Sequence, residues 1–130
     1  MSWERTEIPN PVVHFEMGCV DSEAQQKFYG DLFDWTIARV SEEWNYGLVQ
    51  CEEGGIGGGI SRSGEDPPWA SVTFYVMVDD LRAYLDKAVS LGATEVLAPM
   101  AMDVNDSKFS IAGFIDPEGN YIGLFRPDQP

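Results

Sequence analysis

His14 and Glu16 are a pair of residues whose types and spacing could carry acid–base chemistry. Both lie in Pro11–Met17, where branched and aromatic residues alternate as in a β-strand. Side chains two positions apart on a strand share a face, so the imidazole and the carboxylate are expected side by side. Because histidine titrates near neutrality, the pair could donate and accept protons in a cleft without a metal. The alternative is structural: a lone histidine on a strand is more often a hydrogen-bonded scaffold residue, and Glu16 could face solvent.

Thr73 and Tyr75 form a second pair with the same spacing, in the strand-like run Ser71–Val78. The other face of that run is entirely apolar and should pack beneath a helix: Val72, Phe74, Val76 and Val78. Thr73 follows His14 by 59 positions, and Tyr75 follows Glu16 by the same interval. We therefore expect these four residues to form a polar cluster on two neighbouring strands.

The elements that must position these residues occur twice in the same order. Asp21 is a helix-start residue, and its helix should end near Asp34. Asp80 starts a second helix with an apolar stripe at helical spacing. Asp21 and Asp80 are 59 residues apart, as are Leu32 and Leu91. A repeat of this length indicates two supersecondary units that share a core.

Each half has the pattern of strand, helix, strand, strand, strand. The remaining strand-like runs are Trp35–Val40, Trp44–Gln50, Gly54–Ile60, Glu95–Met100, Phe109–Asp116 and Tyr121–Arg126. A first module at about residues 11–60 and a second at about 70–127 are joined by a proline-bearing linker at 61–69. The sequence therefore predicts one α+β domain of two tandem βαβββ modules.

Composition and charge exclude several classes of function. The 130 residues contain 8 Lys+Arg against 22 Asp+Glu, a net charge of −14. Such a surface repels phosphate backbones and anionic lipids, so no nucleic-acid or membrane partner is expected. The most apolar window is far shorter than a membrane span, and the N-terminus does not resemble a signal peptide. Cys19 and Cys51 lack metal or redox spacing and are expected as free thiols in the cytoplasm, with a bridge left open.

The aromatic residues divide between the core and the pocket. Four are expected in the core: Phe15, Phe28, Phe33 and Phe74. Four further aromatic residues could lie in the core, in the pocket wall or at a subunit contact, and the sequence alone does not decide: Trp35, Trp44, Tyr46 and Trp69. Of these, we assign Trp44 and Tyr46 to the pocket wall.

Four segments together resemble the vicinal oxygen chelate superfamily. They are VVHFEM (residues 12–17), FYGDLFDW (28–35), VDDL (78–81) and DPEGNYIGLF (116–125). That superfamily contains glyoxalase I, extradiol dioxygenases and bleomycin- and fosfomycin-resistance proteins, and the chain looks like one of its small glyoxalase-like members. The resemblance implies a curved mixed sheet with a concave pocket, helices on its outer face, and a homodimer.

The resemblance also implies one divalent metal ion held by the first and last strand of each module. The matching positions hold His14, Gly58 or a neighbour, Thr73 and Gly123. Glycine has no ligating side chain and threonine is a poor ligand for such metals, so only His14 matches. We therefore expect no metal site, and we expect the glycines to enlarge the floor of the cavity.

These observations predict a protein that binds a small apolar, aromatic or cationic molecule in the concave pocket, without a cofactor. The expected lining is His14, Glu16, Thr73, Tyr75, Trp44 and Tyr46. The alternative is a lyase, isomerase or dioxygenase of the same superfamily, acting with a divalent metal or through His14 and Glu16. A partner-binding module with a vestigial pocket is the third possibility.

Overall fold

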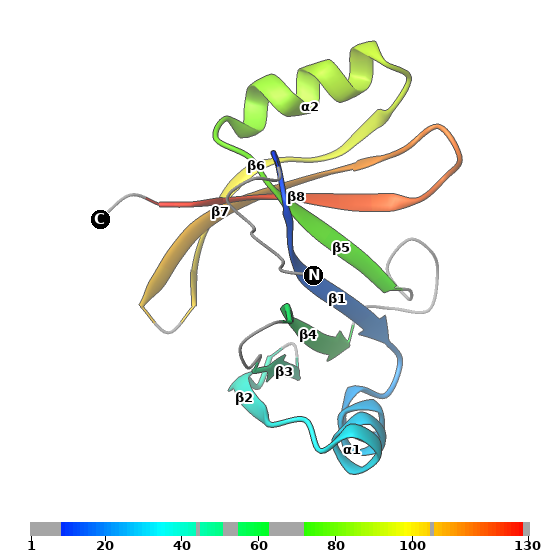
Figure 1. Ribbon diagram of the computed structural model, residues 1–130, viewed down its shortest axis with the longest axis vertical. Helices are drawn as coiled ribbons and strands as arrows, with labels where there is room; N and C mark the ends of the chain where they lie inside the picture. Colours follow the sequence, from blue (N-terminus) through cyan, green and yellow to red (C-terminus); the bar gives the residue numbers. More distant parts are fainter. Residues whose placement is uncertain (1–8, 44, 51–54, 63–71, 105, 129–130) are drawn as a thin grey trace, which may run out of the picture. The chain divides into compact units, whose positions relative to one another are not determined.

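The chain folds into two modules, each with one helix and four strands. The computed structural model describes residues 9–43, 45–50, 55–62, 72–104 and 106–128. The elements are β1 (Val12–Cys19), α1 (Ser22–Phe33), β2 (Ile37–Ser41), β3 (Tyr46–Val49), β4 (Gly57–Arg62), β5 (Val72–Met77), α2 (Leu81–Ser90), β6 (Thr94–Val104), β7 (Ser107–Ile115) and β8 (Tyr121–Pro127) (Figure 1). The α+β class and the tandem βαβββ order predicted from the sequence are confirmed.

Two compact units make up the chain. His14–Val72 form one, called here the N-terminal unit; Thr73–Pro130, together with the residues before His14, form the C-terminal unit. β4 continues to Arg62, so the first two residues of the predicted linker are strand. Residues 63–69 of that linker lie outside the described residues, as do Trp44 and Cys51.

The N-terminal unit has the strand order β2-β3-β4-β1, in which β1 and β4 are parallel. His14 pairs with Gly57 and Glu16 pairs with Gly59. α1 packs on β3 and β4. The buried core is Met17, Val49 and Ile60, with Phe15, Cys19, Tyr29, Trp35 and Ile37 packed around it. Alternate residues of β1 thus face the helix, which leaves His14 and Glu16 on the opposite face, as the alternation predicted.

The C-terminal unit has the order β5-β8-β7-β6, and β5 and β8 are parallel. Tyr75 pairs with Gly123. α2 lies along these strands and packs chiefly on β6, β7 and β8 (Figure 1). Its core consists of Val78, Leu81, Leu85, Ala112 and Leu124.

Both helices begin where the sequence predicted. The Asp21 carboxylate accepts a hydrogen bond from the Ala24 amide at 3.1 Å, and Asp80 accepts one from Ala83 at 3.0 Å. Each side chain satisfies an amide that the first turn leaves unpaired. α1 ends at Phe33, and the following Asp34 caps it in a left-handed conformation with φ of 57°. Among the described residues, neither helix is long and apolar enough to cross a membrane.

Three of the four phenylalanines assigned to the core are exposed, which corrects that prediction. Phe28, Phe33 and Phe74 expose 56%, 53% and 41% of their surface. On α1 the one fully buried residue is Ser22, because the helix packs through its polar first turns. On β5, Val72 is also exposed, since α2 packs on the other strands. Of the four apolar residues predicted to pack beneath a helix, only Val76 and the following Val78 join the core.

Candidate functional site

The N-terminal unit brings three polar side chains into one hydrogen-bonded triangle. His14 Nε2 lies 2.9 Å from Glu16 Oε2 and 3.0 Å from the Tyr46 hydroxyl oxygen. The Tyr46 hydroxyl donates to the same Glu16 oxygen at 2.9 Å. The side chains of His14 and Glu16 are 27% and 23% exposed, so water reaches the triangle only in part. Polar interactions at such half-buried positions are stronger than in open solvent.

Strand geometry creates this triangle. His14 and Glu16 share a face because they alternate along β1. Tyr46 begins β3, and its ring lies over Gly59, where a β-carbon would overlap the phenol. A glycine in a strand often marks such a close approach. The phenol hydroxyl can therefore reach β1 from β3.

A cavity of about 540 Å³ adjoins His14 in the same unit. It is lined by His14, Thr36, Leu48, Val49, Gln50, Gly57 and Gly58. Among these described residues His14 is the single titratable side chain, and it is also a corner of the triangle. The volume lies within the range of small-molecule sites. The arrangement can hold a small molecule between apolar and polar walls and offer it a hydrogen-bonding imidazole.

Two of the other predicted site residues belong to the C-terminal unit. Thr73 and Tyr75 are on β5 of the C-terminal unit, where the Thr73 hydroxyl donates to the Tyr121 carbonyl and the Tyr75 ring lies over Gly123. Trp44 is outside the described residues. The structure thus joins Tyr46 to His14 and Glu16, and the four-residue cluster with Thr73 and Tyr75 stays a prediction.

Gly58 does line the cavity beside His14, but the space next to Gly58 and Gly123 is taken by rings of the chain itself. A β-carbon at Gly58 would meet the Phe15 ring on the helix-facing side, and one at Gly123 would meet the Tyr75 ring. The strand pairs Glu16–Gly59 and Tyr75–Gly123 also make Gly59, rather than Gly58, the counterpart of Gly123. Gly59 in turn lies beneath Tyr46.

The donor set of this face does not fit the metal that the resemblance implies. One imidazole and one carboxylate converge here, and both already bind the Tyr46 hydroxyl. Within the described ranges no group of three or more His, Cys, Asp or Glu side chains could hold a metal ion. Protein sites for zinc use at least three such ligands. The chemistry of the triangle is therefore derived from its own three groups.

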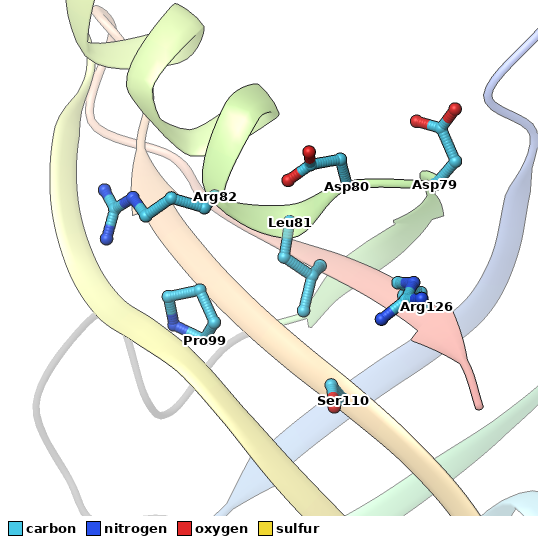
Figure 2. Close-up of a pocket in the computed structure, with 7 residues that line it drawn as sticks. All are labelled: Asp79, Asp80, Leu81, Arg82, Pro99, Ser110 and Arg126. Carbon is cyan, nitrogen blue, oxygen red and sulfur yellow. The ribbon is translucent and has the colours of Figure 1, made fainter.

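A second hollow, of about 360 Å³, lies in the C-terminal unit beside the first turn of α2 (Figure 2). Leu81 points into it, while the carboxylates of Asp79 and Asp80 point away from Arg126 (Figure 2). Asp80 already caps the helix, and Arg82 is paired with two carboxylates, those of Asp86 and Glu95. This hollow brings together no acid–base pair, and we do not assign it as the site.

The Cys19 thiol is half-buried and hydrogen-bonded. Its Sγ donates to the Ser61 carbonyl at 3.2 Å, and the side chain packs against the core of the N-terminal unit. Burial raises the pKa of the Cys19 thiol above its ordinary value, which lowers the thiolate fraction at neutral pH.

Sequence reasoning missed most of the cavity wall. Leu48 follows Tyr46 by two positions on β3 and so shares its face, an alternation that was readable from the sequence. Thr36, Gln50 and Gly57 are at strand ends, and their convergence depends on the pairing of β2, β3 and β4. No local pattern reveals such pairing.

Comparison with known proteins identifies the fold. A family model described as a glyoxalase-like domain matches residues 13–125. A glyoxalase/bleomycin resistance protein/dioxygenase superfamily member from Vibrio splendidus 12B01 is 17% identical, with a TM-score of 0.68 over 92% of this chain and 100% of that one. No curated protein sequence matches the chain.

Two enzymes are also similar in structure. Methylmalonyl-CoA epimerase from Mycobacterium tuberculosis is 15% identical, with a TM-score of 0.64 over 91% of this chain and 88% of that one. The 2,2',3-trihydroxybiphenyl 1,2-dioxygenase from Sphingomonas wittichii strain RW1 is 14% identical, with a TM-score of 0.62 over 91% of this chain and 42% of that one. At these identities the similarity shows the fold alone, so the activity has to be argued from the residues of the site.

Proposed function

The chain belongs to the glyoxalase-like domain family, and on that premise we propose that it binds a small molecule in the cavity of its N-terminal unit. The observation that carries the proposal is a cavity of about 540 Å³ with His14 in its wall. That histidine is fixed from behind by Glu16 and Tyr46. A preformed cavity with one oriented polar group is the usual form of a small-molecule site.

The lining indicates the chemistry of the ligand. Leu48 and Val49 favour an apolar or aromatic body, and Thr36, Gln50 and His14 offer hydrogen bonds. The net charge of −14 draws cations towards the protein and repels anions. A neutral or cationic aromatic compound fits these features best, and bleomycin resistance in the description of the Vibrio splendidus structure is consistent with that class.

A thermal-shift screen followed by calorimetry tests this function. Aromatic metabolites and cationic antibiotics are the probes, and a binder is expected to raise Tm by mass action. Leu48→Ala, in the cavity wall, should then weaken binding by about tenfold, the equivalent of roughly 1.4 kcal/mol. Leu32→Ala is the matched control, because that leucine is 57% exposed on α1. Equal loss in both variants, or no binder in either class, contradicts the proposal.

The triangle supports a second function, proton transfer to or from the bound molecule. In this function Glu16 would be the general base, and its hydrogen bond to His14 would hold it in place. A carbon-bound hydrogen of the ligand should then exchange with D₂O in the presence of the protein, as NMR would follow. Glu16→Gln should abolish the exchange while binding persists. If the unmodified protein does not accelerate this hydrogen exchange, proton transfer is contradicted and only ligand binding is left as the proposed function.

Location and assembly are further proposals. The acidic charge and the family suggest a cytoplasmic homodimer with no nucleic-acid or membrane partner. Light scattering coupled to gel filtration would give a dimer mass if this is correct, and the monomer mass of 14.4 kDa would refute it.

A further inference from the structure

The helix α1 presents three large apolar side chains to solvent. Phe28, Leu32 and Phe33 expose 56%, 57% and 53% of their surface, and we call them the α1 patch. Phe28 and Leu32 are four positions apart, so they are neighbours on the helix surface. Because a large apolar side chain presents about 150–250 Å², half exposure of three gives a patch of roughly 300 Å². Apolar patches of a few hundred Å² are often interaction surfaces.

The rings of the α1 patch are held by other rings of the same unit. The Phe28 ring meets the Tyr29 ring edge-on, with the centroids 5.0 Å apart. The Phe33 ring lies 6.1 Å from the Tyr29 ring and 5.2 Å from the Trp35 ring. Tyr29 and Trp35 in turn pack around the core of the N-terminal unit. Since the rings are positioned before any contact forms, association through them costs little side-chain entropy.

The carboxylates of α1 are paired with cations, although the chain as a whole is strongly acidic. Glu23, Lys27 and Asp31 follow one another at four-residue spacing, so they form a row of alternating charge along the helix beside the patch. Lys27 Nζ lies 2.7 Å from Asp31, and the Arg39 guanidinium lies 3.1 Å from Glu23. The helix face around the patch therefore carries much less unpaired negative charge than the composition of the chain implies.

We propose that the α1 patch is the surface through which two copies of this chain associate, with α1 packed against α1 about a two-fold axis. The inference rests on the homodimer proposed above and names its interface. Each copy has a net charge of −14, so two copies repel one another wherever unpaired carboxylates meet. The ion pairs of α1 reduce that repulsion at the patch. A basic partner would find both carboxylates of this helix already paired.

Antiparallel packing makes this face complementary to itself. A two-fold axis near Gly30 places Phe28 against Leu32 of the partner subunit, so that each apolar contact occurs twice. The same axis brings the charged row beside its own copy in reverse order, with Lys27 within one helical turn of Asp31 of the partner subunit. A stable interface buries about 800 Å² on each side. The α1 patch is then its apolar core, and the charged row is part of its polar rim.

Analytical ultracentrifugation of two double variants tests the surface. Phe28→Gln with Leu32→Gln removes most of the patch, keeps good helix formers and adds no charge. The unmodified protein should sediment with twice the monomer mass of 14.4 kDa, and this double variant should raise the dimer Kd by at least about 30-fold, as for hot-spot residues. Val89→Gln with Leu91→Gln is the matched control, because these side chains are 44% and 73% exposed on and directly after α2. The control should remain as dimeric as the unmodified protein.

A mixed NMR sample locates the interface without any variant. Half of the copies are labelled with ¹³C, and isotope-filtered NOEs then arise only between the two subunits of a dimer. We expect such NOEs from the methyl groups of Leu32 to aromatic protons. Intersubunit NOEs that leave out α1 overturn the proposal.

The sedimentation results separate this inference from the others. A double variant at Phe28 and Leu32 that stays as dimeric as the unmodified protein, or a control that dissociates equally, overturns the α1 interface alone. An unmodified protein that is monomeric at every concentration overturns the homodimer as well. Thermal unfolding checks that each variant is folded. The residues of the α1 patch do not line the cavity beside His14, so ligand binding is tested independently of this interface.

Discussion

The helices of the two units follow the first strand of each module, but their first two turns are anchored by opposite chemistry. α2 is fixed by Leu81 and Leu85, both buried in the core of the C-terminal unit. The residues 59 positions earlier, on α1, are Ser22 and Gln26. An apolar anchor in one repeat is thus a polar anchor in the other.

The polar anchor of α1 reaches the strands that carry the site. Ser22 Oγ lies 2.7 Å from the Asn45 carbonyl oxygen and 3.1 Å from that of Ile60. Gln26 Nε2 lies 2.9 Å and 3.2 Å from the same two oxygens. Asn45 directly precedes Tyr46, and Ile60 directly follows Gly59. The first turns of α1 therefore fix the backbone next to Tyr46 and next to Gly59.

The two units therefore differ in what holds them together and in whether they carry a candidate site. The C-terminal unit buries leucines, and the equivalents of His14 and Glu16 there are Thr73 and Tyr75. Among the described residues of the N-terminal unit, the buried core is Met17, Val49 and Ile60, and directional hydrogen bonds hold the start of α1. Hydrogen bonds fix positions more narrowly than apolar contacts do, which suits a site that needs a defined geometry.

The largest expected effect is in the apolar anchor. Leu85→Ala should destabilise the protein by about 2–5 kcal/mol, because it removes a fully buried side chain and leaves a cavity. Urea denaturation measures the change. Leu91→Ala is the control, since Leu91 is 73% exposed at the end of α2. A loss below about 1 kcal/mol for Leu85 would mean that α2 is not anchored through it.

Gly59→Ala comes next and acts on the triangle. The new methyl group collides with the Tyr46 hydroxyl, so a loss of about 1–3 kcal/mol is expected, together with changed His14 resonances. Gly30→Ala is the matched control. Gly30 lies within α1, and its β-carbon would make ordinary contacts with Trp35 and Ile37, so the substitution should be neutral or stabilise by up to about 1 kcal/mol. Similar stability losses for the two variants would refute the close approach at Gly59.

Gln26→Leu makes α1 resemble α2 at this position. The carbonyls of Asn45 and Ile60 lose a donor, and a loss of about 1–2 kcal/mol is expected in urea denaturation. Gln25→Leu is the control, because that amide makes a weak contact with the Met17 sulfur at 3.7 Å. If Gln26→Leu stabilises the protein, an apolar anchor serves both helices equally well.

The helix caps should show the smallest effect and the least difference between the units. Asp21→Ala and Asp80→Ala each remove one hydrogen bond to the first turn, and each should cost about 1 kcal/mol in thermal or urea unfolding. A difference of more than twofold between them would show that the two helix starts are not equivalent.

Local patterns in the sequence predicted much of this structure. Both caps, the strand alternation that separates His14 from Phe15, and the tandem order follow from rules that act over a few residues. The polar anchor escaped prediction, because Phe28 and Phe33 were expected to attach α1 to the core, and both are exposed. The triangle was only half predicted, since Tyr46 reaches His14 through strand pairing that no local pattern encodes.

Mapping a bound ligand by NMR tests the central claim that the chemistry of this protein lies in the N-terminal unit. Amide spectra of ¹⁵N-labelled protein are recorded during titration with a binder from the thermal-shift screen. Shift changes are expected to concentrate at His14, Leu48 and Gly57, with the imidazole resonances of His14 moving in parallel. Changes confined to Asp79–Arg82 and Arg126, beside the hollow of the C-terminal unit, would contradict the account.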